Sequence, residues 1–206
     1  MQPLLYKDVF LEDDRVLLRT LQEDDMEHLM PFAINEPELW KYSLVGGEGA
    51  AGMSQYFSIA TKEKLERKEH PFIVFDKRTQ EYAGSTRFYD INFPFNTIQL
   101  GYTWYGKRFQ GTGLNKHCKL LLLQYAFEML GMERVELRAD AQNTRSIAAM
   151  KSIGCLVDGI LRANMPKKQG GRRDSIVLSI LKEEWFTDVK QRLLKKMKEI
   201  DKEKFG

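Results

Sequence analysis

A helical repeat of apolar positions marks the middle of the chain. Apolar side chains recur at three- and four-residue intervals at Leu114, Cys118, Leu121, Leu122, Tyr125, Ala126 and Met129. Residues with this spacing share one face of an α-helix, so the pattern predicts an amphipathic helix that begins near residue 114. Gly131 follows the last apolar position, and glycine there can adopt the left-handed conformation that commonly ends a helix.

Strand patterns lie on both sides of this helix. Runs rich in apolar, β-branched and aromatic residues predict strands over residues 16–18, 72–75, 83–89, 98–105, 135–140, 156–162 and 175–181. The second, third and fourth of these follow one another through short connections, which predicts an antiparallel meander. The last two are joined by a loop that contains Gly170 and Gly171, so they should also form a pair.

Caps and composition predict further helices. Thr20 and Glu23 have the spacing of a capping box, in which side chains bind the backbone N–H groups at a helix start, and a helix should follow to about residue 33. Asn143 can cap a helix that ends near Gly154, and the segment 183–204 carries an apolar stripe at helical spacing. This order of elements predicts an α/β fold with a mixed central sheet, antiparallel at its ends, and flanking helices.

The segment between residues 46 and 69 carries no chemistry that the sequence can assign. Its glycine-rich stretch 46–52 is expected to be a loop. Residues 54–68 have helical composition, and the charged run 62–69 is expected to form a solvated face.

The composition is that of one globular domain. The 206 residues lie below the ~250 at which a single hydrophobic core usually stops growing, so residues 1–206 are expected to form one domain. Hydrophobic residues make up 43% and charged residues 30% of the chain, which argues against a disordered or collagen-like protein. The net charge of +3 is too small to hold a nucleic acid by electrostatics alone.

Cysteine usage and apolar runs restrict the metal and membrane hypotheses. Cys118 and Cys155 lack the spacing of a zinc-binding pair, so reduced thiols and no metal are expected. The sequence contains no apolar run of the ~20 residues that cross a bilayer, and acidic residues in the first 20 are unlike a secretory signal. These features predict a cytoplasmic protein, and they favour core packing over membrane binding for the stripe of 183–204.

Residues 105–114, the glycine turn, are the most informative segment, because a predicted strand ends there and the long helix begins. Gly106, Gly111 and Gly113 permit positive φ and close approach to the backbone, and the N–H groups at a helix start favour phosphate oxygens. Positive charge is added nearby by Lys107, Arg108, Lys116 and Lys119. A pyrophosphate group would fit here, although a packing turn with surface lysines would explain the same residues.

Two common nucleotide-binding motifs do not account for the glycine turn. Gly106 and Gly111 have the spacing of the first half of a P-loop, but Thr112 and Gly113 stand where the motif needs Lys and then Ser or Thr. The dinucleotide-binding motif would place its third glycine at Lys116. A nucleotide-binding module is therefore the weakest hypothesis for this segment.

The combination Arg108-x-x-Gly111-x-Gly113 resembles the acyl-CoA pyrophosphate signature of the GCN5-related N-acetyltransferase (GNAT) superfamily. The flanking segments 99–102, 135–140 and 143–154 resemble the family in the same order. The resemblance covers about residues 16–185 and is greatest for the RimJ/RimL-like branch, the ribosomal-protein alanine acetyltransferases. It implies a GNAT fold, in which the strand that ends near Tyr105 and the strand 135–140 splay apart around the pantetheine arm of acetyl-CoA.

The resemblance also implies which residues bind acetyl-CoA. Backbone groups near Trp104 and Tyr105 would hold the pantetheine, and Asn143 and Ser146 would contact the pantetheine or its sulfur end. A helix cap at Asn143 with an ordinary first-turn serine explains the latter two residues equally well. With Arg108 nearby, the pyrophosphate would accept hydrogen bonds from the backbone N–H groups of Gln110, Gly111, Thr112, Gly113 and Leu114.

The proton donor of the family is missing at its usual position. Many members have a tyrosine that protonates the departing thiolate, but the matching residue here is Met150. Ser146, directly or through water, is the first substitute, and Tyr102 is a weaker one. A strong acid is optional, because a thiol with a pKa near ~8.5 leaves as thiolate at neutral pH at a cost of roughly 2 kcal/mol.

The sequence also leaves more than one candidate for the general base. Glu136 is the first candidate, since its strand borders the expected splay and its side chain opposes the face of Val135 and Leu137. A solvated or salt-bridged Glu136 is the competing interpretation. Relatives often have Glu where this chain has Gln99, and Asp90 and Asp140 are weaker candidates. His28, His70 and His117 show no catalytic or metal-binding pattern in the sequence.

The sequence therefore predicts an N-acetyltransferase, an acyltransferase in which an amine directly attacks acetyl-CoA without a covalent enzyme intermediate. The branch resemblance favours a protein N-terminal α-amine as acceptor. The alternatives are a small amine and a non-catalytic acyl-CoA-binding module. Residues 35–53 and 164–173 are expected to shape access for the acceptor. Neither nucleic acid, membrane nor metal is expected as a partner, and a homodimer is left open.

Overall fold

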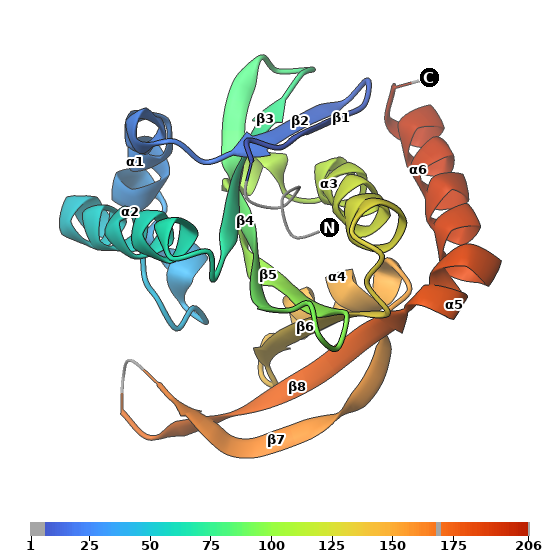
Figure 1. Ribbon diagram of the computed structural model, residues 1–206. Helices are drawn as coiled ribbons and strands as arrows, with labels where there is room; N and C mark the ends of the chain where they lie inside the picture. Colours follow the sequence, from blue (N-terminus) through green and yellow to red (C-terminus); the bar gives the residue numbers. More distant parts are fainter. Residues whose placement is uncertain (1–6, 168–169, 206) are drawn as a thin grey trace.

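A single mixed sheet lies at the centre of the protein, with helices on both faces (Figure 1). The computed structural model describes residues 7–167 and 170–205, with side chains to residue 200. The eight strands are ordered β1-β2-β3-β4-β5-β6-β8-β7. All neighbouring pairs are antiparallel except β5 and β6, which are parallel. The predicted α/β fold with a mixed sheet is confirmed.

The strands agree well with the sequence prediction. They are β1 (Phe10–Glu12), β2 (Val16–Thr20), β3 (His70–Asp76), β4 (Glu81–Asn92), β5 (Thr97–Tyr105), β6 (Arg134–Asp140), β7 (Leu156–Pro166) and β8 (Arg172–Leu181). The meander β3-β4-β5 and the β7-β8 pair are present as predicted. β1 was not predicted, because three residues are too few to show a period.

The helices are α1 (Met26–Asn35), α2 (Gly49–Leu65), α3 (Leu114–Gln124), α4 (Thr144–Ser152), α5 (Lys182–Glu184) and α6 (Lys190–Phe205). A π-helical turn, Tyr125–Met129, continues α3 over the predicted apolar repeat, and Gly131 follows with the expected positive φ of 70°. A second π-helical turn, Trp185–Val189, joins α5 to α6. The predicted C-terminal helix is therefore present, with an irregular first part.

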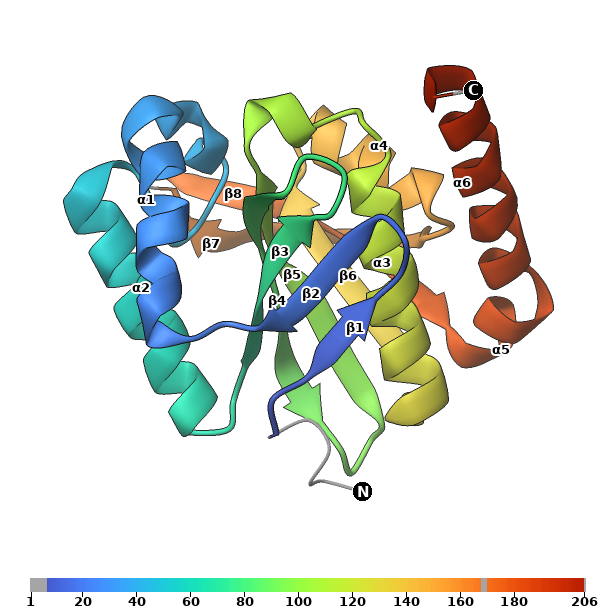
Figure 2. The ribbon, with the colours of Figure 1, turned by 90° about the horizontal axis from the view of Figure 1, so that it is seen from above.

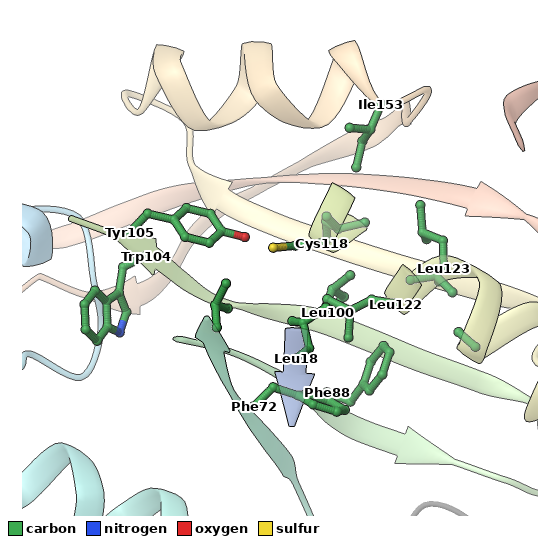
Figure 3. Close-up of a cluster of buried hydrophobic side chains, with 14 of the residues drawn as sticks. Leu18, Phe72, Phe88, Leu100, Trp104, Tyr105, Cys118, Leu122, Leu123 and Ile153 are labelled. Carbon is green, nitrogen blue, oxygen red and sulfur yellow. The ribbon is translucent and has the colours of Figure 1, made fainter. Parts of the chain in front are cut away.

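Helices cover the two faces of the sheet in separate groups. α1 and α2 lie on one face, and α3 and α6 lie on the other (Figures 1 and 2). Leu18, Phe88, Leu100 and Leu122 belong to the core between α3 and the sheet (Figure 3). The C-terminal stripe packs on this core as predicted, since its Trp185, Val189, Leu193 and Met197 are buried. Among the described helices, none combines the length and apolar character that crossing a membrane requires.

The first helix starts later than the capping-box prediction. Thr20 belongs to β2, where its hydroxyl accepts a hydrogen bond from Val9 N at 2.8 Å and contacts His70 Nε2 at 3.0 Å. The chain turns instead at Gln22, whose backbone N–H donates to the Asp25 carboxylate at 2.8 Å. The predicted loop 46–52 was also too long, because α2 begins inside it at Gly49.

β5 and β6 separate after a short stretch of pairing. They pair only over Thr97–Gln99 and Arg134–Glu136. Beyond that, β5 continues beside β4 to Tyr105, while β6 continues beside β8 to Asp140. A register shift opposite Ser85 to Arg87, with Tyr102 at a φ of 49°, forms a β-bulge in β5. The predicted splay between the two strands is confirmed.

Candidate active site

A cavity of about 930 Å³ occupies the opening between β5 and β6. Its walls come from β5, from the second half of β6, from the starts of α3 and α4, and from the segment after α1. This volume lies in the range of ~300–1,000 Å³ that is typical of small-molecule sites. The splay therefore creates a binding space where a continuous sheet would have closed it.

The glycine turn forms one end of this cavity. Gly111 and Gly113 line it with φ values of 73° and 96°, which confirms the expected positive φ. A Cβ atom added to Gly111 would meet no atom within 4 Å, so the backbone there is open to a ligand. α3 begins directly afterwards at Leu114, and N–H groups of a first helical turn lack partners within the helix. This end of the cavity can therefore bind an anion.

Gln110 connects the turn to two other elements. Its Nε2 donates to the Tyr105 carbonyl at 2.7 Å, and its Oε1 accepts from Arg145 Nη1 at 2.5 Å. Arg145 and Lys116 also line the cavity. They are the cationic side chains that border the anion-binding end.

Arg108 differs from its expected placement beside the pyrophosphate. Its side chain is 57% exposed, forms an ion pair with Glu81 at 2.8 Å and is absent from the cavity wall. Thr112 and Leu114 are not wall residues either: the Thr112 hydroxyl donates to the Phe109 carbonyl, and Leu114 is in the core. Only their backbone N–H groups could serve the predicted role, and that of Leu114 also donates to Thr112 Oγ1 at 3.4 Å.

The expected pantetheine contacts do line the cavity. Trp104 and Tyr105 of β5 and Asn143 and Ser146 at the start of α4 are all wall residues. Asn143 Oδ1 accepts a hydrogen bond from Ser146 N at 3.1 Å, which confirms the helix cap. Their contact with a ligand stays a prediction. Met150, also in the wall, is buried and has no proton to donate.

Glu136 lies outside the cavity wall, between two arginines. Its Oε1 accepts from Arg138 Nε at 2.6 Å, and its Oε2 accepts from Arg134 Nη2 at 3.0 Å. Both oxygens are thus occupied, as the salt-bridge interpretation expected. The role of Glu136 as base stays a prediction that this geometry does not favour.

Other predicted candidates border the cavity. Asp90, Gln99, Tyr102 and Asp140 are wall residues, and Asp140 Oδ1 accepts from Gln142 N at 2.9 Å. The Gln99 Oε1 is buried without a hydrogen-bond partner among the described residues. Burial raises the pKa of the Tyr102 phenol above its usual value, with a further contribution from the Glu69 carboxylate. Tyr102 therefore holds its proton firmly near neutral pH.

The end of the cavity opposite the glycine turn contains residues that the sequence did not reveal. Glu69, taken as part of a solvated charged run, lines the cavity and forms an ion pair with Arg87 at 2.6 Å. The guanidinium carbon of fully buried Arg87 lies 4.7 Å from the Tyr56 ring centre and 4.3 Å from that of Tyr102. A pattern of neighbouring residues in the sequence cannot reveal these contacts, because they join elements that are distant along the chain.

The two segments expected to shape access also meet here. The segment Glu38–Leu44 contributes wall residues, and so do Met165 and Arg173 from the β7-β8 hairpin. Arg173 Nη1 donates to the Tyr42 carbonyl at 3.1 Å, which joins the two segments across the cavity. This side of the cavity is thus built from several separate elements, whereas the glycine-turn side is built on a helix start.

Lys119 was expected to reinforce the anion site, with an ordinary surface lysine as the alternative, and the structure shows that it is not a surface residue. Its side chain is only 4% exposed and lines the cavity, where Nζ donates to Thr103 Oγ1 at 2.9 Å. Burial lowers the pKa of the amine to about 8. Lys119 follows Cys118, which lies on the apolar face of α3. Its proximity to the glycine turn in the sequence therefore did not indicate that its side chain is buried.

One cluster of possible metal ligands lies elsewhere. Asp13, Asp14 and His117 place their ligand atoms within 4.8 Å of one another. Asp13 Oδ2 contacts His117 Nδ1 at 2.7 Å, and Asp13 Oδ1 accepts from the N–H groups of Arg15 and Val16. The hydrogen bonds account for Asp13 as a turn-stabilising residue, and none of the three residues lines the cavity.

Comparison with known proteins identifies the family. The family model described as "Acetyltransferase (GNAT) domain" matches residues 15–156. The chain is 36% identical over 178 residues to a Bacillus subtilis (strain 168) protein named "Putative ribosomal N-acetyltransferase YdaF", a match that covers 84% of this chain and 94% of that protein.

Solved structures show the same fold. A GCN5-related N-acetyltransferase from Brucella melitensis has a TM-score of 0.85 at 23% identity, covering 93% of this chain and 86% of that one. Mycobacterium smegmatis RimJ in complex with CoA-disulfide has a TM-score of 0.74 at 18% identity, covering 92% and 93%. The chain therefore belongs to the GNAT acetyltransferase family and is an N-acetyltransferase, with relatives that support its place in the RimJ/RimL-like branch.

Proposed function

We propose that this N-acetyltransferase takes the acetyl group from acetyl-CoA and transfers it to the N-terminal α-amine of a protein. The observation that carries the proposal is the splay of β5 from β6, which opens a cavity with an anion-binding helix start at one end and a loop-lined chamber at the other. A molecule with a pyrophosphate at one end and a reactive thioester at the other matches this division.

The cosubstrate would lie along β5. Backbone N–H groups of residues 111–114 would bind the pyrophosphate, helped by Arg145 and Lys116 instead of Arg108. The Gln110 N–H differs from its expected role, because it donates to the Lys107 carbonyl at 3.1 Å. The pantetheine would extend past Tyr105 and Trp104 toward the β-bulge at Tyr102, with Asn143 and Ser146 on its α4 side. The open backbone at Gly111 supports this placement, because a side chain there would fill the space that the pyrophosphate needs.

The acceptor would enter through the loop-lined end. Glu69 and Asp90 place carboxylates in that part of the wall, where they can attract an ammonium group before it loses its proton. Gln99 cannot act as a base, and both oxygens of Glu136 are held by arginines. Such a site suits an α-amine, whose pKa near ~8 leaves a useful neutral fraction, better than a lysine amine near ~10.4.

The relatives point the same way. The B. subtilis relative carries the word ribosomal in its name, and the M. smegmatis neighbour is a RimJ protein bound to a CoA compound. These properties belong to those proteins. They make a protein N terminus the acceptor class to test first in this chain.

The test is an acetyl-transfer assay with acetyl-CoA and paired peptides, read by mass spectrometry. One peptide has a free N terminus and a blocked lysine, and its partner has a blocked N terminus and a free lysine. A panel of polyamines and aminoglycosides runs beside them. The proposal expects transfer to the free N terminus. Transfer to small amines alone would replace the acceptor class, and CoA binding without any transfer would indicate a binding module.

A further inference from the structure

The Lys119 side chain is buried, and the described part of the protein gives its ammonium group few hydrogen-bond or charge partners. Its side chain is 4% exposed in the cavity wall, and its hydrogen bond to Thr103 Oγ1 is the one that Nζ makes among the described residues. No carboxylate of the described chain forms an ion pair with it. Because buried charges are usually paired, a cavity that leaves an ammonium in this state is suited to a ligand that brings the missing partner.

The neighbouring groups do not supply a negative charge. The Cys118 and Cys155 thiols act on the Lys119 amine electrostatically, but burial raises the pKa of each thiol to about 12, so both are neutral. The Tyr105 phenol, which points toward Cys118 (Figure 3), has its pKa raised well above the usual value by burial. On the α4 side, the wall residues Ser146, Ala149, Met150 and Ser152 carry no charge, and Arg145 is a cation.

The proposed substrate contains one group that becomes an anion in the interior of the cavity. The pyrophosphate is at the glycine turn, and the pantetheine amides are neutral, whereas the sulfur becomes a thiolate when the acetyl group leaves. Lys119 lines the same cavity as Ser146 and Met150, and its amine is hydrogen-bonded to Thr103, which lies on β5 between Tyr105 at the glycine turn and the β-bulge at Tyr102. An ammonium there can both attract the developing negative charge and give it a proton.

We propose that Lys119 is the catalytic acid that donates a proton to the leaving CoA thiolate, with Thr103 holding its amine in position. The inference rests on the proposed function. The acceptor nitrogen forms a bond to the acetyl carbon, the C–S bond breaks, and its electron pair stays on sulfur. The Lys119 ammonium first holds the thiolate as an ion pair, and its Nζ proton moves to sulfur as CoA leaves, which gives a thiol and a neutral amine. The acceptor nitrogen loses its extra proton to solvent, and Lys119 regains one from solvent after product release.

The direct test follows ionisation of CoA bound to the protein. Thiolate absorbance is recorded across pH for the CoA complex, and the same titration with desulfo-CoA is subtracted to remove tyrosine signals. The chain's own thiols, with pKa values of about 12, stay silent. In the wild type, the bound thiol should ionise at a pH about one unit below the ~8.5 of an ordinary thiol, because a nearby cation favours the anion.

Lys119→Met provides the comparison. In this variant the thiol of bound CoA should ionise at the same pH as free CoA or at a higher pH. The variant should also lower kcat by roughly tenfold or more, with little change in the Kd for desulfo-CoA. Lys119→Arg keeps the charge and removes a readily lost proton, so it should keep the low ionisation pH and still lower kcat. Lys151→Met, at an exposed position on α4, is the control that should leave both readouts unchanged.

Three results would overturn the inference. An ordinary ionisation pH for CoA in the wild-type complex excludes the charge effect without reference to any variant. A normal kcat in folded Lys119→Met, with a wild type that binds CoA and acetylates an amine, rejects the acid and leaves the proposed function standing. If the wild type binds neither CoA nor acetyl-CoA, the proposed function fails and the inference fails with it.

Discussion

The two ends of the cavity are built in different ways. The glycine-turn end uses consecutive residues: a strand end, two glycines with positive φ and the start of α3. The acceptor end uses side chains from separate elements, with Glu69 before β3, Arg87 on β4 and Tyr42 linked to Arg173 across the cavity. The first end presents backbone groups and the second presents side chains.

This difference suggests that one end determines cosubstrate binding and the other determines which acceptor is used. Backbone N–H groups can bind the same pyrophosphate whatever the acceptor is, and they tolerate changes in most side chains of the turn. The end proposed to take the acceptor can change its charge and shape through single side-chain substitutions. Perturbing one end should therefore alter cosubstrate binding, and perturbing the other should alter acceptor use.

The largest expected effect is on the glycine-turn end. Gly111→Asp would place a carboxylate beside the pyrophosphate and should weaken CoA binding by about 100-fold or more, since like charges ~4 Å apart repel by ~4 kcal/mol at an effective dielectric near 20. Calorimetric titration with CoA measures this. Gly171→Asp is the matched control, because its φ of 76° is close to the 73° of Gly111 and its added Cβ also meets no atom. Equal CoA affinities in the two variants would contradict the proposed pyrophosphate site at the glycine turn.

The next effect concerns the acceptor end. Glu69→Gln removes the charge partner of the fully buried Arg87 and should lower the free energy of unfolding by about 3 kcal/mol, as for other broken buried pairs. It should also raise the KM for the amine while the Kd for CoA stays constant. Denaturant unfolding and steady-state kinetics measure the two effects.

Glu63→Gln is the matched control for Glu69. It lies in the same charged run, and its contact with Lys68 is 4.0 Å long and partly exposed, so the stability change should stay below about 1 kcal/mol. If Glu69→Gln is as mild as this control and leaves the KM for the amine unchanged, the acceptor end does not use Glu69.

Lys119 should make the stability of the protein depend on pH. Its folded-state pKa of about 8 lies below the usual 10.5, so between these values the unfolded chain binds more protons and stability rises with pH. Below pH 8 the buried charge should destabilise the fold by roughly 3 kcal/mol. Lys119→Met should therefore be more stable than the wild type at pH 7, by a margin that shrinks toward pH 10. A margin that does not change with pH in paired urea titrations would show that Lys119 has an ordinary pKa.

The smallest effect is expected at Glu136. Its carboxylate lies between Arg134 and Arg138 outside the cavity wall, so Glu136→Gln should leave kcat and its pH profile close to the wild type. Stability should change by about 1 kcal/mol or less, because these side chains are partly exposed. A large fall in the kcat of Glu136→Gln would instead restore Glu136 as the base.

Local patterns predicted the parts of the protein that local interactions determine. The period of α3, the cap at Asn143 and the positive φ at Gly111 and Gly113 each depend on a few consecutive residues, and all were visible in the sequence. The splay was anticipated from the family resemblance, since pairing between β5 and β6 involves segments that a helix separates.

Contacts between distant elements were harder to foresee. Glu69 looked like part of a solvated run until β4 brought Arg87 beside it. Arg108 looked like a phosphate ligand, but Glu81 lies within ion-pair distance and draws it to the surface. Lys119 looked exposed because lysines usually are, yet α3 turns it toward Thr103. In each case the partner is distant in the sequence, and a local sequence pattern carries no information about such contacts.

The central claim is that backbone groups at the start of α3 bind the pyrophosphate of the acyl carrier. Calorimetric titration of the wild-type protein with CoA and with pantetheine, which has the thiol arm but neither the pyrophosphate nor the 3′-phosphoadenosine beyond it, tests it most directly. The account predicts that CoA binds at least about 100-fold more tightly, as several charge-assisted hydrogen bonds would provide. Equal affinities for the two compounds would contradict it.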